Sequence, residues 1–240
     1  MGWHQELLIG FDLETTGTDP HEARIVTAAV IEVRGGEPLG HRQWLADPGV
    51  PIPEEAVAVH GISNERAAAE GAPADRVADA VAEALTGYWK TGVPVVAYNA
   101  AFDLTLLAAE LRRHGLPSLG DRLGGAEPGP VVDPYTIDRS VDRYRRGKRT
   151  LQAVCTEYGV VLGSAHDASA DALAAARLAG AIAGRHPKVA ALGPAELHRR
   201  QIEWYAAWAA DFQSFLRRKG DAGAVVDGTW PLRQPAGETV

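Results

Sequence analysis

The stretch LLIGFDLETTG, residues 7–17, joins a short apolar run to two acidic residues and a polar turn. An apolar run of this length with an abrupt polar end is typical of a buried β-strand. Asp12 and Glu14 are two residues apart, so their side chains lie on the same face of that strand. Carboxylates this close repel one another unless a cation lies between them, and oxygen ligands suit Mg²⁺ or Mn²⁺. For an isolated Asp-x-Glu pair, however, a strand end with solvated acids is the better interpretation.

The segments after this strand predict a mixed sheet covered by helices. Residues 24–33 and 38–46 are strand candidates with short connections, which favours an antiparallel meander. Helices and strands then alternate, with strands predicted at 93–98 and 131–132, and helices at 75–88, directly after residue 98, at 150–158 and at 168–184. This order predicts an α/β fold in which helices lie on both faces of the sheet.

The C-terminal part of the chain is predicted to be a helical extension. The tripeptide at 185–187 ends the last helix of a first domain, which we place at residues 1–190, and residues 191–240 form the extension and its tail. One long helix is expected over residues 195–219. Its apolar stripe contains Leu197, Trp204, Tyr205, Trp208, Phe212, Phe215 and Leu216. Such a stripe most often packs against its own domain. The alternative is self-association or binding to a partner such as a polymerase, because Trp and Tyr are enriched at interfaces.

The overall composition is that of an ordinary globular protein, with 46% hydrophobic and 23% charged residues among 240. The formal net charge is −7, so binding to nucleic acid would require local basic patches or metal cations. One such patch, at residues 139–149, contains Arg139, Arg143, Arg145, Arg146, Lys148 and Arg149. We interpret it as a contact to phosphates or, alternatively, as a solvated loop face.

The single cysteine and the absence of a long apolar run indicate the setting of the protein. Cys155 excludes an intrachain disulfide, and its helical spacing predicts a buried thiol in a reducing compartment. No uninterrupted apolar run in the sequence approaches the length of a membrane span. We therefore expect a soluble, cytoplasmic protein with no membrane contact.

A further carboxylate falls in the segment NAAFD, residues 99–103. Asp103 lies at the start of a predicted helix and four residues before Leu107, which places it on the buried stripe of that helix. A buried carboxylate requires a hydrogen-bonding partner or a metal. An acid that is favoured by the helix N-terminus explains this position equally well.

The segment HDASAD, residues 166–171, leads into the Ala-rich helix. Five residues on a helix rotate by about 140°, so His166 and Asp171 cannot share a face if both are helical. We expect His166 in the preceding loop and Asp171 in the first turns, where both side chains converge on one point. Asp167 and Ser169 are the competing helix caps. Taken alone, His166 is more often a capping or surface histidine.

Together, the three segments resemble the DEDD superfamily of 3′→5′ exonucleases, in the subgroup that uses a histidine base. This group includes the proofreading epsilon subunit of bacterial DNA polymerase III, RNase T and oligoribonuclease. The motifs FDLETTG, NAAFD and HDASADA occur in the order of the family, over roughly residues 6–185. The segments VHGI at 59–62 and VVDP at 131–134 support the resemblance.

The resemblance implies a ribonuclease-H-like fold with a five-stranded mixed sheet. It also implies that two divalent cations, Mg²⁺ or Mn²⁺, are held by Asp12, Glu14, Asp103 and Asp171, and that His166 is the general base, so all five residues are catalytic. The residues that match substrate-binding positions are Leu13, Thr15, His60, Asn99 and Phe102. An ideal strand would point Leu13 away from the neighbouring acids, so its role requires a bend at the strand end.

The activity implied by the resemblance is removal of nucleotides from the 3′ end of single-stranded nucleic acid. DNA is favoured as the substrate, in proofreading or repair. The alternatives are an exoribonuclease that trims RNA, or a polymerase-associated scaffold subunit with a secondary nuclease activity. The 2′-hydroxyl contacts that separate DNA from RNA substrates are not visible in the sequence.

Overall fold

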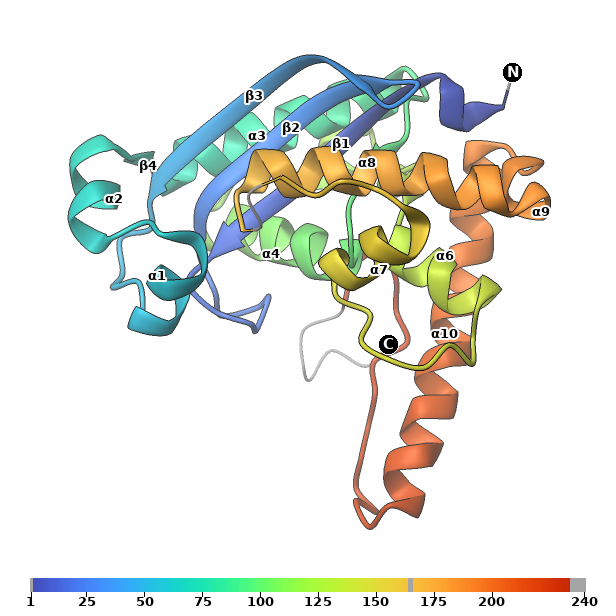
Figure 1. Cartoon of the computed structure of the whole chain (residues 1–240). Helices are drawn as coiled ribbons and strands as arrows, with labels where there is room; N and C mark the ends of the chain where they lie inside the picture. Colours follow the sequence, from blue (N-terminus) through green and yellow to red (C-terminus); the bar gives the residue numbers. More distant parts are fainter. Residues whose placement is uncertain (1, 164–165, 234–240) are drawn as a thin grey trace.

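The computed structural model describes residues 2–163 and 166–233. Its centre is a mixed sheet with the strand order β4-β3-β2-β1-β5-β6. Figure 1 labels the first four of these strands along the chain, β1 to β4. The strands are β1 (Leu7–Thr15), β2 (Ile25–Arg34), β3 (Glu37–Asp47), β4 (Ala72–Pro73), β5 (Val95–Val96) and β6 (Val131–Val132). The first three strands form an antiparallel meander, whereas β5 and β6 run parallel to β1. The carboxyl ends of β1, β5 and β6 therefore meet at one edge of the sheet.

Helices cover both faces of this sheet, and each face has its own apolar core. The helices are η1 (Trp3–Gln5), α1 (Glu54–His60), α2 (Asn64–Glu70), α3 (Ala74–Lys90), α4 (Ala100–Arg113), α5 (Leu119–Arg122), α6 (Pro134–Val141), α7 (Leu151–Tyr158), α8 (Ala168–Arg185), α9 (Pro187–Ala190) and α10 (Pro194–Arg218). Residues Ile9 and Phe11 of β1 pack with α3 and α4, and Leu8 packs with α7 and α8. Alternation along β1 thus supplies both cores.

The predicted α/β organisation is confirmed, with one strand more than the expected five. The additional strand, β4, consists of two residues that pair in parallel with the end of β3. No strand propensity marks an Ala-Pro pair, and its placement follows from the packing of α2 against β3. Helix α6 was also not predicted, although Asp133 caps it by accepting from the backbone N–H of Tyr135 and Pro134 occupies its first turn.

Helix α8 crosses β1 at very short range. A Cβ atom added to Gly10 would lie 2.3 Å from the carbonyl oxygen of Ala172, which belongs to the backbone of the helix. Glycine in a strand interior often marks such a close backbone approach. The alanines of α8 keep the facing surface flat, so the first turn of the helix, with Asp171, lies over β1.

The first half of α10 is packed against the edge strand β6, where it replaces a missing neighbouring strand. Gln201 is fully buried; its Oε1 accepts from the backbone N–H of Asp133 at 2.7 Å, and its Nε2 donates to the carbonyl oxygen of Val131 at 2.9 Å. His198 Nδ1 accepts from the N–H of Val131 at 3.1 Å. The beginning of the predicted C-terminal extension therefore satisfies the backbone groups of the sheet edge.

Two expectations from composition are tested by the structure. Cys155 is buried, as predicted, and burial raises the pKa of its thiol to about 11. Across residues 2–163 and 166–233, the helices are too short or too polar to cross a membrane.

The close contact at Gly10 leads to a stability prediction. Gly10→Ala should lower the free energy of unfolding by roughly 1–3 kcal/mol, because overpacking must move either β1 or the backbone of α8. Gly184→Ala is the matched control, since Gly184 lies in the same helix with open space around its Cα, and alanine should there stabilise by about 0.5–1 kcal/mol. Urea unfolding of both variants measures the difference. Equal stability of the two variants would contradict the proposed close packing.

Candidate active site

The predicted acidic residues converge at the carboxyl end of β1. Asp12 and Glu14 come from the strand itself, Asp103 from the first turn of α4, and Asp171 from the first turn of α8. Because α4 and α8 cover opposite faces of the sheet, the strand end lies between the two helices (Figure 1). Asp103 is 4% exposed, and its Oδ1 accepts from the backbone N–H of Leu13 at 3.1 Å. This hydrogen bond ties α4 to the residue between the two strand acids.

His166 and Asp171 have the arrangement that was expected from their spacing. His166 lies in a turn before α8 with φ +65°, and its backbone N–H donates to Asp171 Oδ2 at 3.2 Å. The helix cap is Asp167, whose Oδ1 accepts from the N–H groups of Ser169 and Ala170 at 3.0 Å each. Since Asp167 performs the capping, the interpretation of His166 as the cap is wrong.

The acids repel one another, and burial adds to this effect. Burial, followed by the charges of Asp103, Asp171 and Glu14, raises the pKa of Asp12 well above its usual range. Burial and the charge of Asp171 raise the pKa of Glu14 to about 7. Burial also raises the pKa values of Asp103 and Asp171; for Asp171 the hydrogen bond from His166 N–H opposes it. At neutral pH the ionised cluster is therefore unfavourable without a compensating cation.

The donor atoms of this cluster fit a divalent cation. One ligand atom each from Glu14, His166 and Asp171 can be chosen so that all lie within 4.8 Å of one another. Asp171 Oδ1 is buried and has no hydrogen-bond partner in the described part of the chain. A set dominated by carboxylate oxygens suits a hard cation such as Mg²⁺ or Mn²⁺.

A cavity of about 430 Å³ opens beside Glu14 and His166. It is also lined by His60, which comes from the end of α1, and by Trp44 and Arg66. The Nδ1 of His60 accepts from the N–H of Ile62 at 3.1 Å, and burial lowers the pKa of His60, so its imidazole is neutral at pH 7. The structure thus brings His60 to the acids, whereas no pattern in the sequence pointed to Trp44 or Arg66.

The other four predicted substrate-binding residues lie at the end of β1 and at the start of α4, and they differ in burial. Thr15 is half-buried beyond the acids, and its hydroxyl donates to the carbonyl oxygen of Gly17 at 2.7 Å. Asn99 precedes α4 with φ +64°, and its N–H donates to Asp133 Oδ1 at 2.9 Å. Phe102 is half-buried against the main core. Leu13 is 6% exposed within that core.

The bend that a substrate contact of Leu13 requires does not occur at this residue. β1 stays in regular register with β2 through Glu14, and the register shifts only between Glu14 and Thr15. The strand therefore points Leu13 into the core, as period-two alternation demands. A contact of Leu13 with substrate stays a prediction.

Asp133 is a structural residue of this site that the chemical interpretation of the sequence missed. It is fully buried at the end of β6 and accepts from the N–H groups of Asn99 and Tyr135 and from the hydroxyl of Thr136. By holding Asn99, Asp133 fixes the start of α4 and hence the helix that carries Asp103. The Asp-Pro pair at 133–134, typical of a helix start, was the available signal.

Comparisons with known sequences identify one matching family and several relatives. The sequence model of one family, described as exonuclease, matches residues 9–179. The DNA polymerase III PolC-type of Lacticaseibacillus paracasei is 25% identical over 162 residues, which cover 68% of this chain and 10% of that protein. The protein of the same name from Streptococcus thermophilus is 29% identical over 170 residues, covering 70% of this chain and 10% of that protein. The chain spans about a tenth of the length of these curated relatives.

Comparisons with solved structures confirm the ribonuclease-H-like fold. E. coli exonuclease I in complex with a dT13 oligonucleotide matches with a TM-score of 0.63 and 20% identity, over 77% of this chain and 42% of that one. Exonuclease X in complex with 5′ overhanging duplex DNA matches with a TM-score of 0.55 and 20% identity, over 81% of this chain and 99% of that one. At this level of identity the likeness concerns the fold.

The raised pKa of Glu14 makes stability depend on pH when divalent cations are removed. Between the ordinary value of 4.5 and about 7, the folded state keeps a proton that the unfolded state releases, so stability is lost as the pH rises through this window. In EDTA, Glu14→Gln should therefore be more stable than wild type, by a margin that grows from about pH 5 to about pH 8. Adding Mn²⁺ at the higher pH should reverse the order, because glutamine is a poorer ligand. Melting temperatures test both statements. A stability difference between Glu14→Gln and wild type that does not change with pH would contradict the raised pKa of Glu14.

Proposed function

This chain belongs to the exonuclease family, and we propose that it removes nucleotides one at a time from the 3′ end of single-stranded DNA. The observation that carries the proposal is the convergence of Glu14, His166 and Asp171 beside Asp12 at the end of β1. This constellation follows the motifs of the DEDD superfamily. DNA is favoured over RNA because the relatives are DNA polymerases by name, and exonuclease I was solved with a DNA oligonucleotide.

We propose that Asp12, Glu14, Asp103 and Asp171 hold two divalent cations, Mg²⁺ or Mn²⁺. Two observations support this assignment: Asp171 Oδ1 has no hydrogen-bond partner among the residues that the structure describes, and the pKa values of the cluster are raised. When bound, such cations neutralise charge on the scissile phosphate and its leaving oxygen and lower the pKa of water. Asp103 has one oxygen engaged with the backbone of Leu13, so its orientation is fixed before any cation binds.

His166 would take the proton from the attacking water at its free ring nitrogen. Its backbone is held by Asp171, and its exposed side chain lines the cavity beside Glu14. An imidazole suits this task because it exchanges protons near neutral pH. The exposed position also lets the proton leave to solvent after each cycle.

The terminal nucleotide would lie between the acids and the cavity that contains His60. We propose that Thr15 and Asn99 contact its sugar and that His60 and Phe102 flank its base. The carboxylates lie within the end of the sheet rather than on a protruding surface. A base-paired terminus would have to separate before its last phosphodiester bond reached them, which favours single-stranded ends.

The proposed polarity predicts a response to blocked ends. With Mn²⁺, the chain should release nucleotides from a single-stranded DNA oligonucleotide, and a 3′-phosphate should suppress release whereas a 5′ block should not. Matched RNA should be degraded more slowly. Asp12→Asn should abolish release, and the control Glu37→Gln, at the opposite edge of the sheet, should not change it. Denaturing gels of labelled oligonucleotides provide the measurement. Digestion that starts equally well from blocked 3′ ends would overturn the proposal.

The role of His166 can be separated from capping by a pair of substitutions. His166→Ala should lower turnover by roughly 10²–10⁴-fold, keep the stabilisation by Mn²⁺, and show a residual rate that rises with pH as hydroxide replaces the base. Asp167→Ala removes the true cap and should cost about 1 kcal/mol of stability, with turnover per folded molecule changed only a few-fold. Melting curves and pH–rate profiles of both variants decide. If His166→Ala behaves like Asp167→Ala, His166 is not the base.

A further inference from the structure

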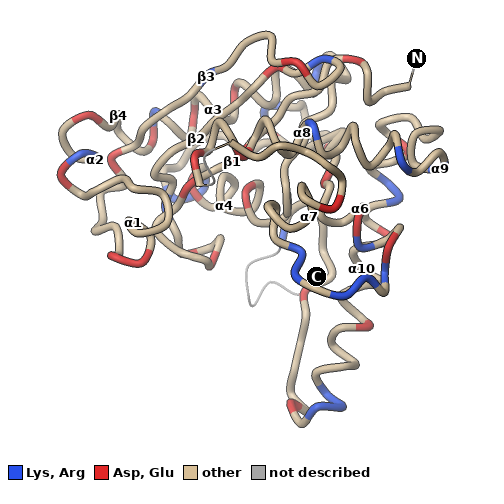
Figure 2. Tube along the Cα trace, in the orientation of Figure 1, with Lys and Arg blue, Asp and Glu red and all other residues tan. Residues whose placement is uncertain are grey.

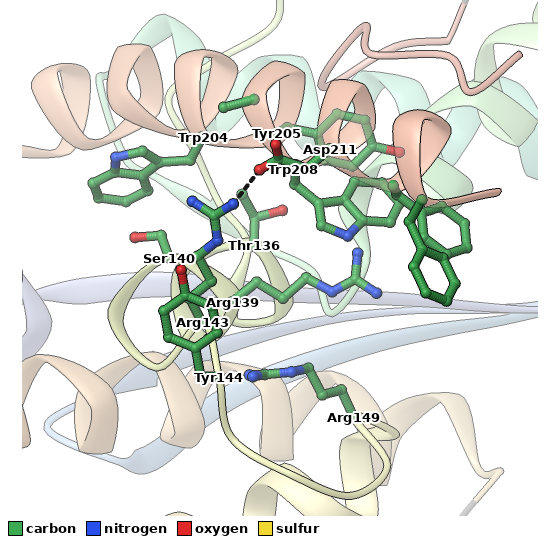
Figure 3. Close-up of a pocket in the computed structure, with 13 residues that line it drawn as sticks. Thr136, Arg139, Ser140, Arg143, Tyr144, Arg149, Trp204, Tyr205, Trp208 and Asp211 are labelled. Carbon is green, nitrogen blue, oxygen red and sulfur yellow. Dashed lines mark hydrogen bonds and ion pairs between the residues drawn. The ribbon is translucent and has the colours of Figure 1, made fainter. Parts of the chain in front are cut away.

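A second cavity, of about 570 Å³, lies between α6, the segment that follows it, and α10 (Figure 3). We call it the arginine–aromatic groove and define it by Arg139, Arg143, Tyr144, Trp208, Phe212 and Phe215. The lining contains three arginines, with Arg149 as the third, against one carboxylate, Asp211. Lysines and arginines also gather along the segment between α6 and α7 beside this groove (Figure 2). In a chain with a net charge of −7, this is a local positive region.

Arg139 is a cation without an anion among the residues that the structure describes. Its guanidinium carbon lies 4.0 Å from the ring centroid of Trp208 (Figure 3). It also lies 4.2 Å from the ring centroid of Tyr135. Its Nη1 is buried and has no hydrogen-bond partner within the described ranges, and burial lowers its pKa. The guanidinium nevertheless keeps its charge. The two rings thus hold a desolvated donor at a fixed place in the groove.

The other arginines that line the groove, and Arg145 beside them, have carboxylate partners. Arg145 and Arg149 both pair with the buried Asp138, and Arg143 pairs with Asp211. Because Arg139 has no carboxylate partner among the described residues, an incoming anion would stabilise its charge more than that of the paired arginines. A phosphate suits it, because guanidinium donors match phosphate oxygens in geometry and charge.

Aromatic rings line the groove next to this cation. Trp208 and Phe212 stack at 5.6 Å with an angle of 14° between their planes, and Phe212 and Phe215 repeat this arrangement at 6.3 Å. Phe212 and Phe215 are 39% and 44% exposed, and Tyr144 on the opposite wall is 85% exposed. Exposed rings beside arginines are the usual means of binding single-stranded nucleic acid without sequence preference.

Side-chain contacts link the groove to the proposed active site. Tyr98 immediately precedes Asn99 at the carboxyl edge of the sheet, and its hydroxyl donates to the carbonyl oxygen of Arg149 at 2.7 Å. The ring of Tyr98 lies 5.4 Å from that of Tyr135, the residue whose ring covers Arg139. These contacts connect Arg149 and the ring that covers Arg139 to the residue next to Asn99, which we propose to contact the 3′-terminal sugar.

We propose that the arginine–aromatic groove binds the part of a single-stranded DNA chain that lies on the 5′ side of the terminal nucleotide. Arg139 contacts a phosphate, and Trp208, Phe212 and Phe215 stack with bases. The assignment rests on the proposed exonuclease function. It gives the second half of α10 a substrate-binding role, whereas the first half closes the edge of the sheet.

Binding without hydrolysis tests the groove directly. In EDTA, a fluorescent 20-nucleotide oligo-dT should bind Arg139→Gln roughly 5–10-fold more weakly than wild type, with a slope of log affinity against log salt smaller by about 0.7. Arg139→Lys should recover part of the loss, and Trp208→Ala should bind more weakly still. Arg185→Gln is the matched control, since Arg185 also covers a tyrosine ring, Tyr158, but pairs with Glu157 away from the groove.

A substitution that strengthens binding guards against variants that merely fail to fold. Asp211→Asn removes the only carboxylate in the described lining and releases Arg143, so it should bind the oligonucleotide severalfold more tightly. A misfolded variant cannot give that result. Wild-type affinity in Arg139→Gln, Trp208→Ala and Asp211→Asn alike would overturn the proposal.

Hydrolysis assays distinguish failure of the groove from failure of the proposed function. With Mn²⁺, Arg139→Gln should lose much more kcat/KM, through KM, on the 20-mer than on a dinucleotide that is too short to reach the groove. Equal losses on both substrates would refute the groove. If wild type cleaves neither substrate, the proposed function fails, while the EDTA measurement still tests the groove. A wild-type dimer without DNA that Trp208→Ala converts to monomer would instead identify the face as a contact between copies.

Discussion

Helix α8 crosses β1 so closely that only glycine fits at position 10, since a Cβ there would lie 2.3 Å from the carbonyl oxygen of Ala172. This contact fixes the height of the helix above the strand and therefore the position of Asp171 relative to the acids of β1. On the opposite face, the hydrogen bond between Asp103 and the backbone of Leu13 sets α4 with similar tightness. The geometry of the site is thus set on one side of the strand by a close backbone approach and on the other by a hydrogen bond from the strand backbone to a carboxylate.

The same two contacts also bring like charges together in the folded chain. They bring four carboxylates into a partly dehydrated space where burial and mutual repulsion raise their pKa values. Packing in the two cores supplies the free energy that opposes this repulsion, because hydrophobic burial is the dominant favourable term in folding. A protein would not keep such a cluster for stability alone. Its position in a buried frame that backbone contacts define favours a role in which cations complete the charge balance.

Much of this arrangement was predictable from local periodicity. Period-two alternation placed Asp12 and Glu14 on one face, and the helical spacing of Asp103 and Leu107 placed Asp103 on the buried side of α4. A local sequence pattern does not specify which distant elements a segment will pair with or pack against. The regular pairing of β1 with β2, which keeps Leu13 in the core, depends on a partner strand that the motif does not describe. The pairing of Ala72–Pro73 with β3 depends on α2 in the same way.

The basic segment at 139–149 shows why charge counted along a sequence differs from charge available to a ligand. Two of its arginines, Arg145 and Arg149, surround the buried Asp138, where an unpaired carboxylate would be strongly unfavourable. These residues hold the segment in place and contribute little free charge. Among the described residues, Arg139 in contrast contacts aromatic rings and no carboxylate, so its position is fixed without neutralisation of its charge. The interpretation of the segment as a phosphate contact therefore applies to Arg139, whereas Arg145 and Arg149 have a structural role. The ion pairs to Asp138 hold part of the segment in place, while Arg139 lies against Trp208 of α10, next to the exposed rings of that helix.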